Sequence, residues 1–195
     1  MINNYNMNEK KKNYKGLGQK LAYLLRHDPT YEFPPEGWRE TMDLIRNHEF
    51  TLDDLKEVVK NDDKGRFEWK DETCAEIRAI QGHSIRRINI KYSLVKPPEV
   101  LYHGTKVSCL DSIFNSSINR MERNYVHLSD NPETAFKSAN RKNRSRKSSD
   151  AGVVLEISAL NMYYDGYSFY LTSNGIWLTP YVPSKYIKIY TTEKL

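Results

Sequence analysis

The pair Pro97-Pro98 constrains the fold of this chain more than any other feature of its sequence. Two consecutive prolines stiffen the backbone and can continue neither a helix nor a sheet. Before the pair the pattern is mainly helical, and after it short β-type runs dominate. A chain of 195 residues is long enough for two modest domains. We therefore predict an α+β protein with one lobe over residues 16–95 and a β-rich lobe over residues 96–195, preceded by a disordered basic N-terminus over residues 1–15.

The first lobe is predicted to contain three helices and a β-hairpin. Leucines three or four residues apart form a helical stripe that stops at Asp28-Pro29: Leu17, Leu21, Leu24 and Leu25. A short second helix is expected around residues 42–45, and Thr51 is placed to cap a third. The alternating runs 66–69 and 76–80 are typical of paired strands. Three helices followed by a hairpin suggest a winged helix.

The second lobe is predicted to be rich in short strands. They are expected at 100–102, 125–128, 153–157, 168–171, 176–179 and 187–190, with helices at 107–114 and 132–140. Neither a dinucleotide fingerprint nor a P-loop is present, so a nucleotide would have to bind in another way. Residues 141–149 carry five basic residues and three serines, which indicates a mobile surface loop.

Composition narrows the class of protein without identifying it. Lys and Arg outnumber Asp and Glu by 30 to 25, a weak bias towards a polyanionic partner. Cys74 and Cys109 lack the spacing of a disulfide framework or a zinc site, and no carboxylate cluster suggests another metal. No apolar run has the length of a signal peptide or a membrane span. We expect an intracellular monomer, cytoplasmic or nuclear, that needs neither a metal nor a membrane.

Three arginines stand at the ends of predicted elements. Arg26 ends the first helix beside His27, Arg66 begins the hairpin, and Arg123 precedes a strand of the second lobe. The planar guanidinium group suits bidentate contact with phosphate and stays charged at physiological pH. Each arginine alone is better explained as a surface residue or a helix-end cation. Together they could clamp one phosphate if the fold brings them into one place.

Three further segments combine histidine with hydroxyl groups, at residues 81–84, 102–105 and 126–129. Such groups could line a polar cleft and bond to ribose hydroxyls or a carboxamide. The alternative is that these histidines are structural, and for His83 this is the preferred interpretation. Trp177, in the segment 174–179, is likewise favoured as a core residue over a stacking platform.

Seven motifs in this order resemble those of the RNA 2′-phosphotransferase family, the family of the tRNA-splicing phosphotransferase. They are LLRH at 24–27, RF at 66–67, QGHS at 81–84, YHGT at 102–105, VHLS at 126–129, DGYSFY at 165–170 and NGIWLT at 174–179. The similarity runs from about residue 17 to residue 190. One departure lies beside a motif arginine, because Asn124 stands at a position where the family often varies.

The resemblance implies a winged-helix lobe that faces RNA and an ADP-ribosyltransferase-like lobe that binds NAD. It implies four catalytic residues, Arg26, His27, Arg66 and Arg123, in which His27 transfers a proton or contacts the phosphate. It also assigns nine residues to the NAD-binding lobe: His103, Gly104, Thr105, His127, Leu128, Ser129, Asn174, Gly175 and Trp177.

The activity implied by the resemblance is NAD-dependent removal of an internal RNA 2′-phosphate, as at a spliced tRNA junction. The phosphate would displace nicotinamide to give an ADP-ribosylated RNA 2′-phosphate. Attack by the ribose 2″-hydroxyl would then give RNA with a free 2′-hydroxyl and ADP-ribose 1″,2″-cyclic phosphate. Two alternatives stay open: an ADP-ribosyltransferase that modifies nucleic-acid phosphates and stops after the first step, and a non-catalytic winged-helix nucleic-acid binder.

Overall fold

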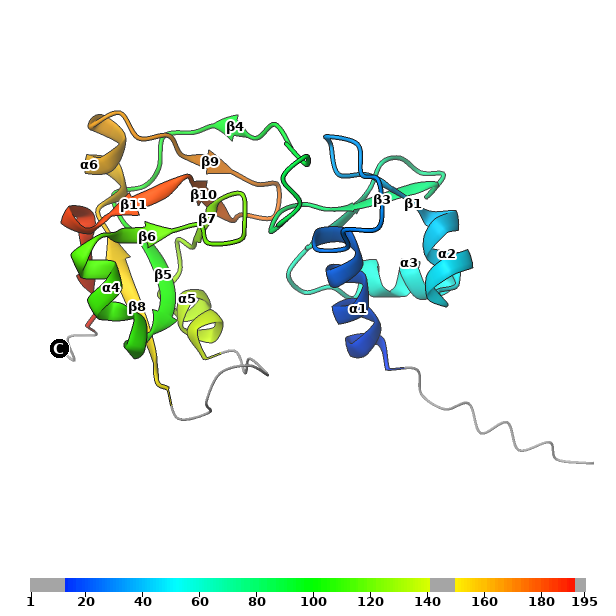
Figure 1. Cartoon of the computed structure of the whole chain (residues 1–195), viewed down its shortest axis with the longest axis horizontal. Helices are drawn as coiled ribbons and strands as arrows, with labels where there is room; N and C mark the ends of the chain where they lie inside the picture. The colour runs from blue at the N-terminus through cyan, green and yellow to red at the C-terminus, as the bar shows by residue number, and fades with distance from the viewer. Residues whose placement is uncertain (1–12, 141–149, 192–195) are drawn as a thin grey trace, which may run out of the picture.

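The computed structural model describes residues 13–140 and 150–191 of the chain. Residues 1–12 of the predicted N-terminal extension, and the basic segment 141–149, lie outside the described residues. Two lobes lie side by side, and each combines helices with strands (Figure 1). The predicted α+β class agrees with this mixture of helix and sheet.

The first lobe consists of three helices and a three-stranded antiparallel sheet. The helices are α1 (Tyr14–Arg26), α2 (Thr41–His48) and α3 (Leu52–Lys60), and the strands are β1 (Arg39–Glu40), β2 (Phe67–Trp69) and β3 (Glu76–Ala79) in the order β1-β3-β2. The three predicted helices and the hairpin are confirmed. Thr51 caps α3, because its side chain accepts from the Asp54 backbone N–H while the Asp54 carboxylate accepts from the Thr51 N–H.

Two details of the first lobe differ from the prediction. The helix α1 begins at Tyr14 with Asn13 as its cap, so Tyr14 and Lys15 are helical and not part of the extension. The strand β1 was not expected, because two residues are too few to show an alternating pattern. The lobe has its own hydrophobic core, which α1 and α3 share with the sheet; it includes Leu21, Leu25, Leu44, Leu55, Phe67 and Ile77.

The second lobe is built from short strands with helices around them. The strands are β4 (Ser93–Leu94), β5 (Leu101–Lys106), β6 (Ser117–Asn119), β7 (Val126–Leu128), β8 (Gly152–Ile157), β9 (Tyr170–Leu171), β10 (Trp177–Thr179), β11 (Tyr181–Pro183) and β12 (Ile187–Ile189). The helices are α4 (Leu110–Asn115), α5 (Pro132–Ala139) and α6 (Ala159–Tyr164), with 3-10 turns η1 (Val107–Cys109) and η2 (Ser184–Tyr186). Strands pair antiparallel in the orders β4-β9-β10-β7, β12-β8-β5 and β11-β6. All six predicted strands and both helices are present, whereas β4, β6, β11 and α6 were not predicted.

The second lobe begins before the proline pair and not at residue 96. The strand β4 pairs with β9, with Leu94 opposite Tyr170, and the Val95 N–H donates to the Phe169 carbonyl at 3.0 Å. The two residues of β4 are too short to reveal a strand, and Pro97-Pro98 lies between β4 and β5. The prolines therefore follow an edge strand of the second lobe instead of separating the lobes.

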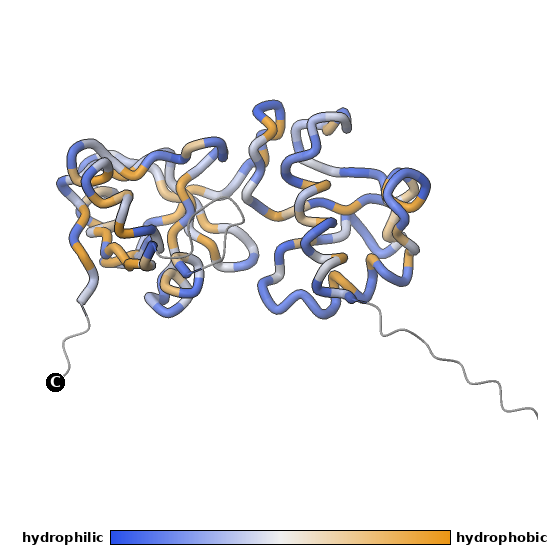
Figure 2. Tube along the Cα trace, turned by 60° about the horizontal axis from the view of Figure 1, so that its bottom comes forward, coloured by the Kyte–Doolittle hydropathy of each residue, from blue (hydrophilic) through white to orange (hydrophobic). Residues whose placement is uncertain are grey.

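Close packing of α5 on β5 explains one of the predicted site residues, Gly104. A Cβ atom at Gly104 would lie 1.9 Å from the Ala135 carbonyl oxygen and 2.9 Å from the Ala139 nitrogen, both in α5. No larger residue fits without moving the helix. Figure 2 shows hydrophobic stretches inside both lobes with hydrophilic turns around them, and the core of the second lobe includes Leu101, Leu128, Leu155, Phe169 and Trp177.

Within residues 13–140 and 150–191, no helix is long and apolar enough to cross a membrane. In the same part of the chain, His, Cys, Asp and Glu form no group of three or more that could hold a metal ion.

Candidate active site between the lobes

Arg26, at the end of α1, packs directly against the backbone of Gly82. Gly82 has a φ of +91°, and a Cβ atom there would lie 3.3 Å from both Nε and Cζ of Arg26. Glycine suits this position because it adopts positive φ readily and leaves room for the guanidinium group. The segment after β3 can therefore approach the end of α1 closely and hold Arg26 in place.

The same segment positions His27. Its Nδ1 lies 2.9 Å from Ser84 Oγ, and the Ser84 N–H donates to the Arg26 carbonyl at 3.0 Å. The second bond satisfies one of the carbonyl groups that a helix leaves open at its C-terminal end. The exposed ring of Tyr23, one turn earlier on α1, lies 6.1 Å from the His27 ring. The motif at 81–84 thus fixes the Arg-His pair that the sequence places side by side.

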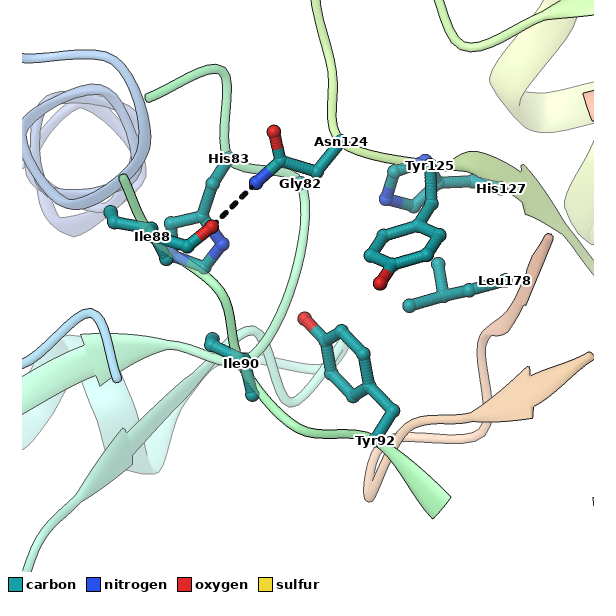
Figure 3. Close-up of a pocket in the computed structure, with 9 residues that line it drawn as sticks. All are labelled: Gly82, His83, Ile88, Ile90, Tyr92, Asn124, Tyr125, His127 and Leu178. Atoms are coloured by element: carbon teal, nitrogen blue, oxygen red, sulfur yellow. Dashed lines mark hydrogen bonds between the residues drawn. The ribbon is translucent and has the colours of Figure 1, made fainter. Parts of the chain in front are cut away.

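Arg123 reaches this place from the second lobe through its neighbour Asn124. The Asn124 N–H donates to the His83 carbonyl at 3.1 Å, and its Nδ2 donates to the Ile88 carbonyl at 2.9 Å (Figure 3). Both acceptors belong to the segment that follows β3. These two bonds dock the loop that carries Arg123 onto the segment that holds Arg26.

The charges of both Arg26 and Arg123 act on His27. Burial lowers the pKa of His27, the Arg26 charge and then the Arg123 charge lower it further, and Glu122 partly opposes them. Charges act on a neighbour in this way only over short distances in a solvated protein. The imidazole is therefore neutral at pH 7, beside two guanidinium groups that come from different lobes.

Two histidines of the second lobe lie in the same field. Burial lowers the pKa of His127 to about 3, with smaller contributions from Arg123 and then Arg26. His103 Nδ1 donates to the His127 carbonyl at 3.0 Å. Burial lowers the pKa of His103, the bond to His127 acts against this, and the Arg123 charge adds to the lowering. Both imidazoles are neutral, so they can act as hydrogen-bonding groups without adding positive charge.

A small cavity between the lobes brings several of these groups together. Figure 3 shows the hydroxyl groups of Tyr92 and Tyr125 directed into it, with His83 on the side of the connecting segment and His127 on the side of the second lobe. Burial also lowers the pKa of His83 to about 3. The Nε2 atoms of His83 and His127 are buried and have no hydrogen-bond partner among the described residues. Buried polar atoms normally have a partner, so these nitrogens suit a polar ligand.

Arg66 is held firmly but lies further along α1. Its Nε and a terminal nitrogen donate to Asp62 Oδ1 at 2.8 and 2.6 Å, and this pairing helps to keep the pKa of Asp62 low against the opposing effect of burial. A Cβ atom at Gly18 would lie 3.9 Å from the Arg66 guanidinium. Gly18 precedes Arg26 by eight residues, about two helical turns. The structure therefore brings Arg26, His27 and Arg123 together, while the Arg66 guanidinium lies beside α1 about two helical turns before Arg26.

Asn174 makes a second connection between the lobes. Its Nδ2 donates to the Lys64 carbonyl at 3.0 Å, and its Oδ1 accepts from Thr172 Oγ1 at 2.7 Å. Gly65 has a φ of +50°, and a Cβ atom at this position would lie 3.4 Å from the Asn174 Cβ atom. The segment 174–179 thus lies against the turn that leads into Arg66, two places that are far apart in the sequence.

The other residues predicted for the second lobe occupy varied environments. Leu128 and Trp177 are buried in the hydrophobic core, so packing accounts for both side chains. Ser129 Oγ accepts from the Asn131 N–H at 3.1 Å at the start of α5. Thr105 is partly exposed on β5, and Gly175, with a φ of +77°, has open space where a side chain would be.

Sequence reasoning missed Asn124, Tyr92 and Tyr125. An asparagine in a polar stretch is also a common turn residue, and the two tyrosines belong to a chain that contains 14 of them. The only sequence signal was the position of Asn124 and Tyr125 between Arg123 and the motif at 126–129. It could not show which segment these residues would meet.

Comparison with known proteins gives one consistent family. The family model that matches residues 11–181 is described as "RNA 2′-phosphotransferase, Tpt1 / KptA family". Three relatives are each named "Probable RNA 2′-phosphotransferase". The protein of Fusobacterium nucleatum is 37% identical over 88% of this chain and 96% of its own length. Those of Pectobacterium atrosepticum and Burkholderia pseudomallei are 38% identical over 86% of this chain and over 93% and 91% of their own lengths.

Proposed function

Because this chain belongs to the RNA 2′-phosphotransferase family, we propose that it removes an internal 2′-phosphate from RNA by transferring it to NAD. In this proposal the first lobe is a winged helix that faces RNA, and the second is an ADP-ribosyltransferase-like lobe that holds NAD. A spliced tRNA is the proposed RNA. The observation that carries the proposal is the convergence of Arg26, His27 and Arg123 from both lobes.

The charges at this place suit a 2′-phosphate. Arg26 and Arg123 stay charged at physiological pH, and each can offer two parallel N–H groups to phosphate oxygens. Neutral His27 can bond to a phosphate oxygen, or accept a proton from a hydroxyl group, because its pKa lies below its ordinary value. Arg66, held by Asp62, completes the proposed catalytic set from a position beside Gly18, about two helical turns before Arg26.

The second lobe contains groups that fit NAD. The buried Nε2 of His127 has no partner among the described residues, and a neutral imidazole can bond to a ribose hydroxyl or a carboxamide. We assign NAD contacts to this histidine and five other predicted residues, His103, Thr105, Ser129, Asn174 and Gly175. Gly104, Leu128 and Trp177 support them by packing. When bound, NAD would supply the ADP-ribose that accepts the phosphate, which leaves nicotinamide and ADP-ribose 1″,2″-cyclic phosphate as products.

The decisive experiment incubates the protein with an RNA that bears one internal 2′-phosphate, with and without NAD, and resolves both the RNA and the nucleotide products. We expect RNA with a free 2′-hydroxyl, together with ADP-ribose cyclic phosphate, only when NAD is present. RNA that accumulates with ADP-ribose attached would instead identify an ADP-ribosyltransferase that stops after the first step. Unchanged RNA and unchanged NAD would leave a nucleic-acid binder as the better interpretation.

The proposal makes Asn124 a residue that positions Arg123. Asn124→Ala removes the Nδ2 bond to the Ile88 carbonyl while it keeps the backbone bond to His83. We expect kcat/KM to fall about tenfold, which corresponds to the loss of one hydrogen bond with a net contribution near 1.4 kcal/mol. Steady-state kinetics with 2′-phosphorylated RNA measure this effect.

A matched control for Asn124 lies at the end of α3. Asn61 Nδ2 also donates to a backbone carbonyl, that of Glu57 at 2.8 Å, but both residues belong to the first lobe. Asn61→Ala should therefore leave kcat/KM nearly unchanged. Equal losses of activity in the two variants would contradict a positioning role for Asn124.

A further inference from the structure

A groove on the second lobe lies outside the site described above. Its lining includes Leu94 and Lys96, from β4 and the segment after it, and Tyr163, Gly166 and Tyr167, from the end of α6 and the turn that follows. We call it the tyrosine-lysine groove. In Figure 1, β4 and α6 lie along the upper side of the second lobe.

The strand β4 connects this groove with the cavity between the lobes. Tyr92, directly before β4, lines the cavity, and Leu94 lines the groove. Two residues of extended chain span about 7 Å, and side chains two positions apart lie on the same side of a strand. An RNA strand whose 2′-phosphate lies beside this small cavity can therefore continue along β4 into the groove.

Apolar and aromatic side chains are unusually exposed at this place. Leu94 is 68% exposed and Tyr164, which follows Tyr163 in α6, is 65% exposed. The rings of Tyr163 and Tyr164 lie 5.9 Å apart, and the ring of Tyr167 lies 5.6 Å from that of Tyr181, which is also exposed. Single exposed apolar residues are ordinary, but adjacent ones mark interaction surfaces.

The charges beside these rings are mainly positive. Lys96 Nζ donates to the Tyr164 hydroxyl at 2.9 Å and lies 5.2 Å from the centre of that ring. Lys185 is exposed and lies 3.4 Å from Asp165, the residue before Gly166 of the groove. Since one carboxylate stands against two ammonium groups, this part of the surface favours an anionic partner.

We propose that the tyrosine-lysine groove binds the single-stranded part of the RNA substrate that adjoins the 2′-phosphate. Aromatic rings that stack with bases, beside cations that attract the phosphodiester backbone, are the combination with which proteins hold single-stranded nucleic acid. The positive charge and the continuity with the cavity select RNA over an apolar peptide. The inference rests on the proposed function, because it takes the 2′-phosphate near Arg26 and Arg123 as the fixed point of the RNA.

The test compares two 2′-phosphorylated substrates, a dinucleotide and a single strand of twelve nucleotides with the phosphate in the middle. One stacked base changes affinity by a factor of about 5 to 150. We therefore expect the wild-type protein to have a KM at least about fivefold lower for the longer strand. Tyr164→Ala should remove most of this advantage and leave turnover of the dinucleotide unchanged, whereas Tyr164→Phe should keep it because the ring remains.

Two controls separate stacking from general effects. Phe114→Ala truncates an exposed aromatic on α4, away from β4 and α6, and should keep the length advantage. A duplex of the same length should have a KM close to that of the dinucleotide, because its bases are already stacked and paired. If the duplex gains as much as the single strand, the stacking role is wrong.

The contribution of Lys96 is measured by the salt dependence of binding of the twelve-nucleotide strand without its 2′-phosphate and without NAD. Lys96→Gln should reduce the slope of log affinity against log salt by about 0.7, the value for one phosphate contact with a single strand. An unchanged slope overturns the role of Lys96. Turnover of both substrates with equal KM overturns the groove but leaves the phosphotransferase standing, and turnover of neither overturns the proposed function itself.

Discussion

Arg123→Ala is expected to lower kcat for 2′-phosphorylated RNA by about 100- to 1000-fold, the usual effect of removing one electrostatic stabiliser from an active site. Arg123 and Arg26 approach the same imidazole from different lobes, so Arg26→Ala should have an effect of similar size. Because the two side chains act on one phosphate in the proposed mechanism, the double variant should lose less activity than the product of the two single losses. Single-turnover kinetics measure all three variants.

A second readout for Arg123 does not depend on activity. The Arg123 charge lowers the pKa of His27, after burial and the Arg26 charge. Arg123→Ala should therefore raise the pKa of His27, which NMR titration of the imidazole can follow. Arg46→Ala, on the exposed side of α2, is the matched control and should change neither kcat nor this pKa. Near-normal turnover in both Arg26→Ala and Arg123→Ala would contradict the phosphate clamp.

Sequence patterns predicted the longer elements of the fold and failed at the shortest ones. The buried face of α1 consists mainly of leucines at helical spacing, and α3 has a capping residue at Thr51. Both helices can therefore be predicted from the sequence. The strands β1 and β4 have two residues each, too few for periodicity. They exist because β3 and β9 lie beside them, which is information about tertiary structure.

The candidate site shows the same limit. Arg26 and His27 could be placed at a helix end from the sequence, but their approach to Arg123 depends on long-range contacts. One is the packing of Arg26 against Gly82, and the other is the docking of Asn124 on His83 and Ile88. A sequence shows that a glycine is present; it does not show which side chain will use the space.

The largest surprise in the first lobe is a buried arginine, Arg39. Beside Trp38 and before Glu40 it has the appearance of a surface residue, yet it is 1% exposed. Its guanidinium donates to Asp28 at 2.8 Å, to Asp43 at 2.6 Å and to the Leu24 carbonyl at 2.9 Å. Leu24 and Asp28 flank the Arg26-His27 pair, so this cluster also fixes the end of α1 that carries the site.

Arg39→Met is expected to lower the free energy of unfolding by about 3–5 kcal/mol, because it leaves the buried carboxylate of Asp28 and the partly buried one of Asp43 without their Arg39 partner. Urea denaturation at pH 7 measures the change, and Arg46→Met on the exposed side of α2 should cost little. A loss below about 1 kcal/mol in Arg39→Met would mean that the aspartates find other partners or water.

The pH dependence of this variant tests whether charge is the cause. Burial alone would raise the pKa of Asp28, but hydrogen bonds from Thr30 and Arg39 and the Arg39 charge hold it below the ordinary value of an aspartate. The pKa of Asp43 is lowered in a similar balance between burial and bonds from Asn47 and Arg39. The wild-type protein therefore keeps this stabilisation above the unfolded-state pKa of about 3.9 and loses it as pH falls through the folded-state values.

Without Arg39, burial should raise both carboxyl pKa values, so the variant relieves its unpaired charges by binding protons as the pH falls. The difference in unfolding free energy between wild type and Arg39→Met should then shrink between pH 7 and about pH 4, because the variant recovers stability by binding protons in this range while the wild type keeps its own. A difference that stays constant with pH would mean that Arg39 acts through its packing on Tyr31, 4.3 Å from the ring centre, and not through its charge.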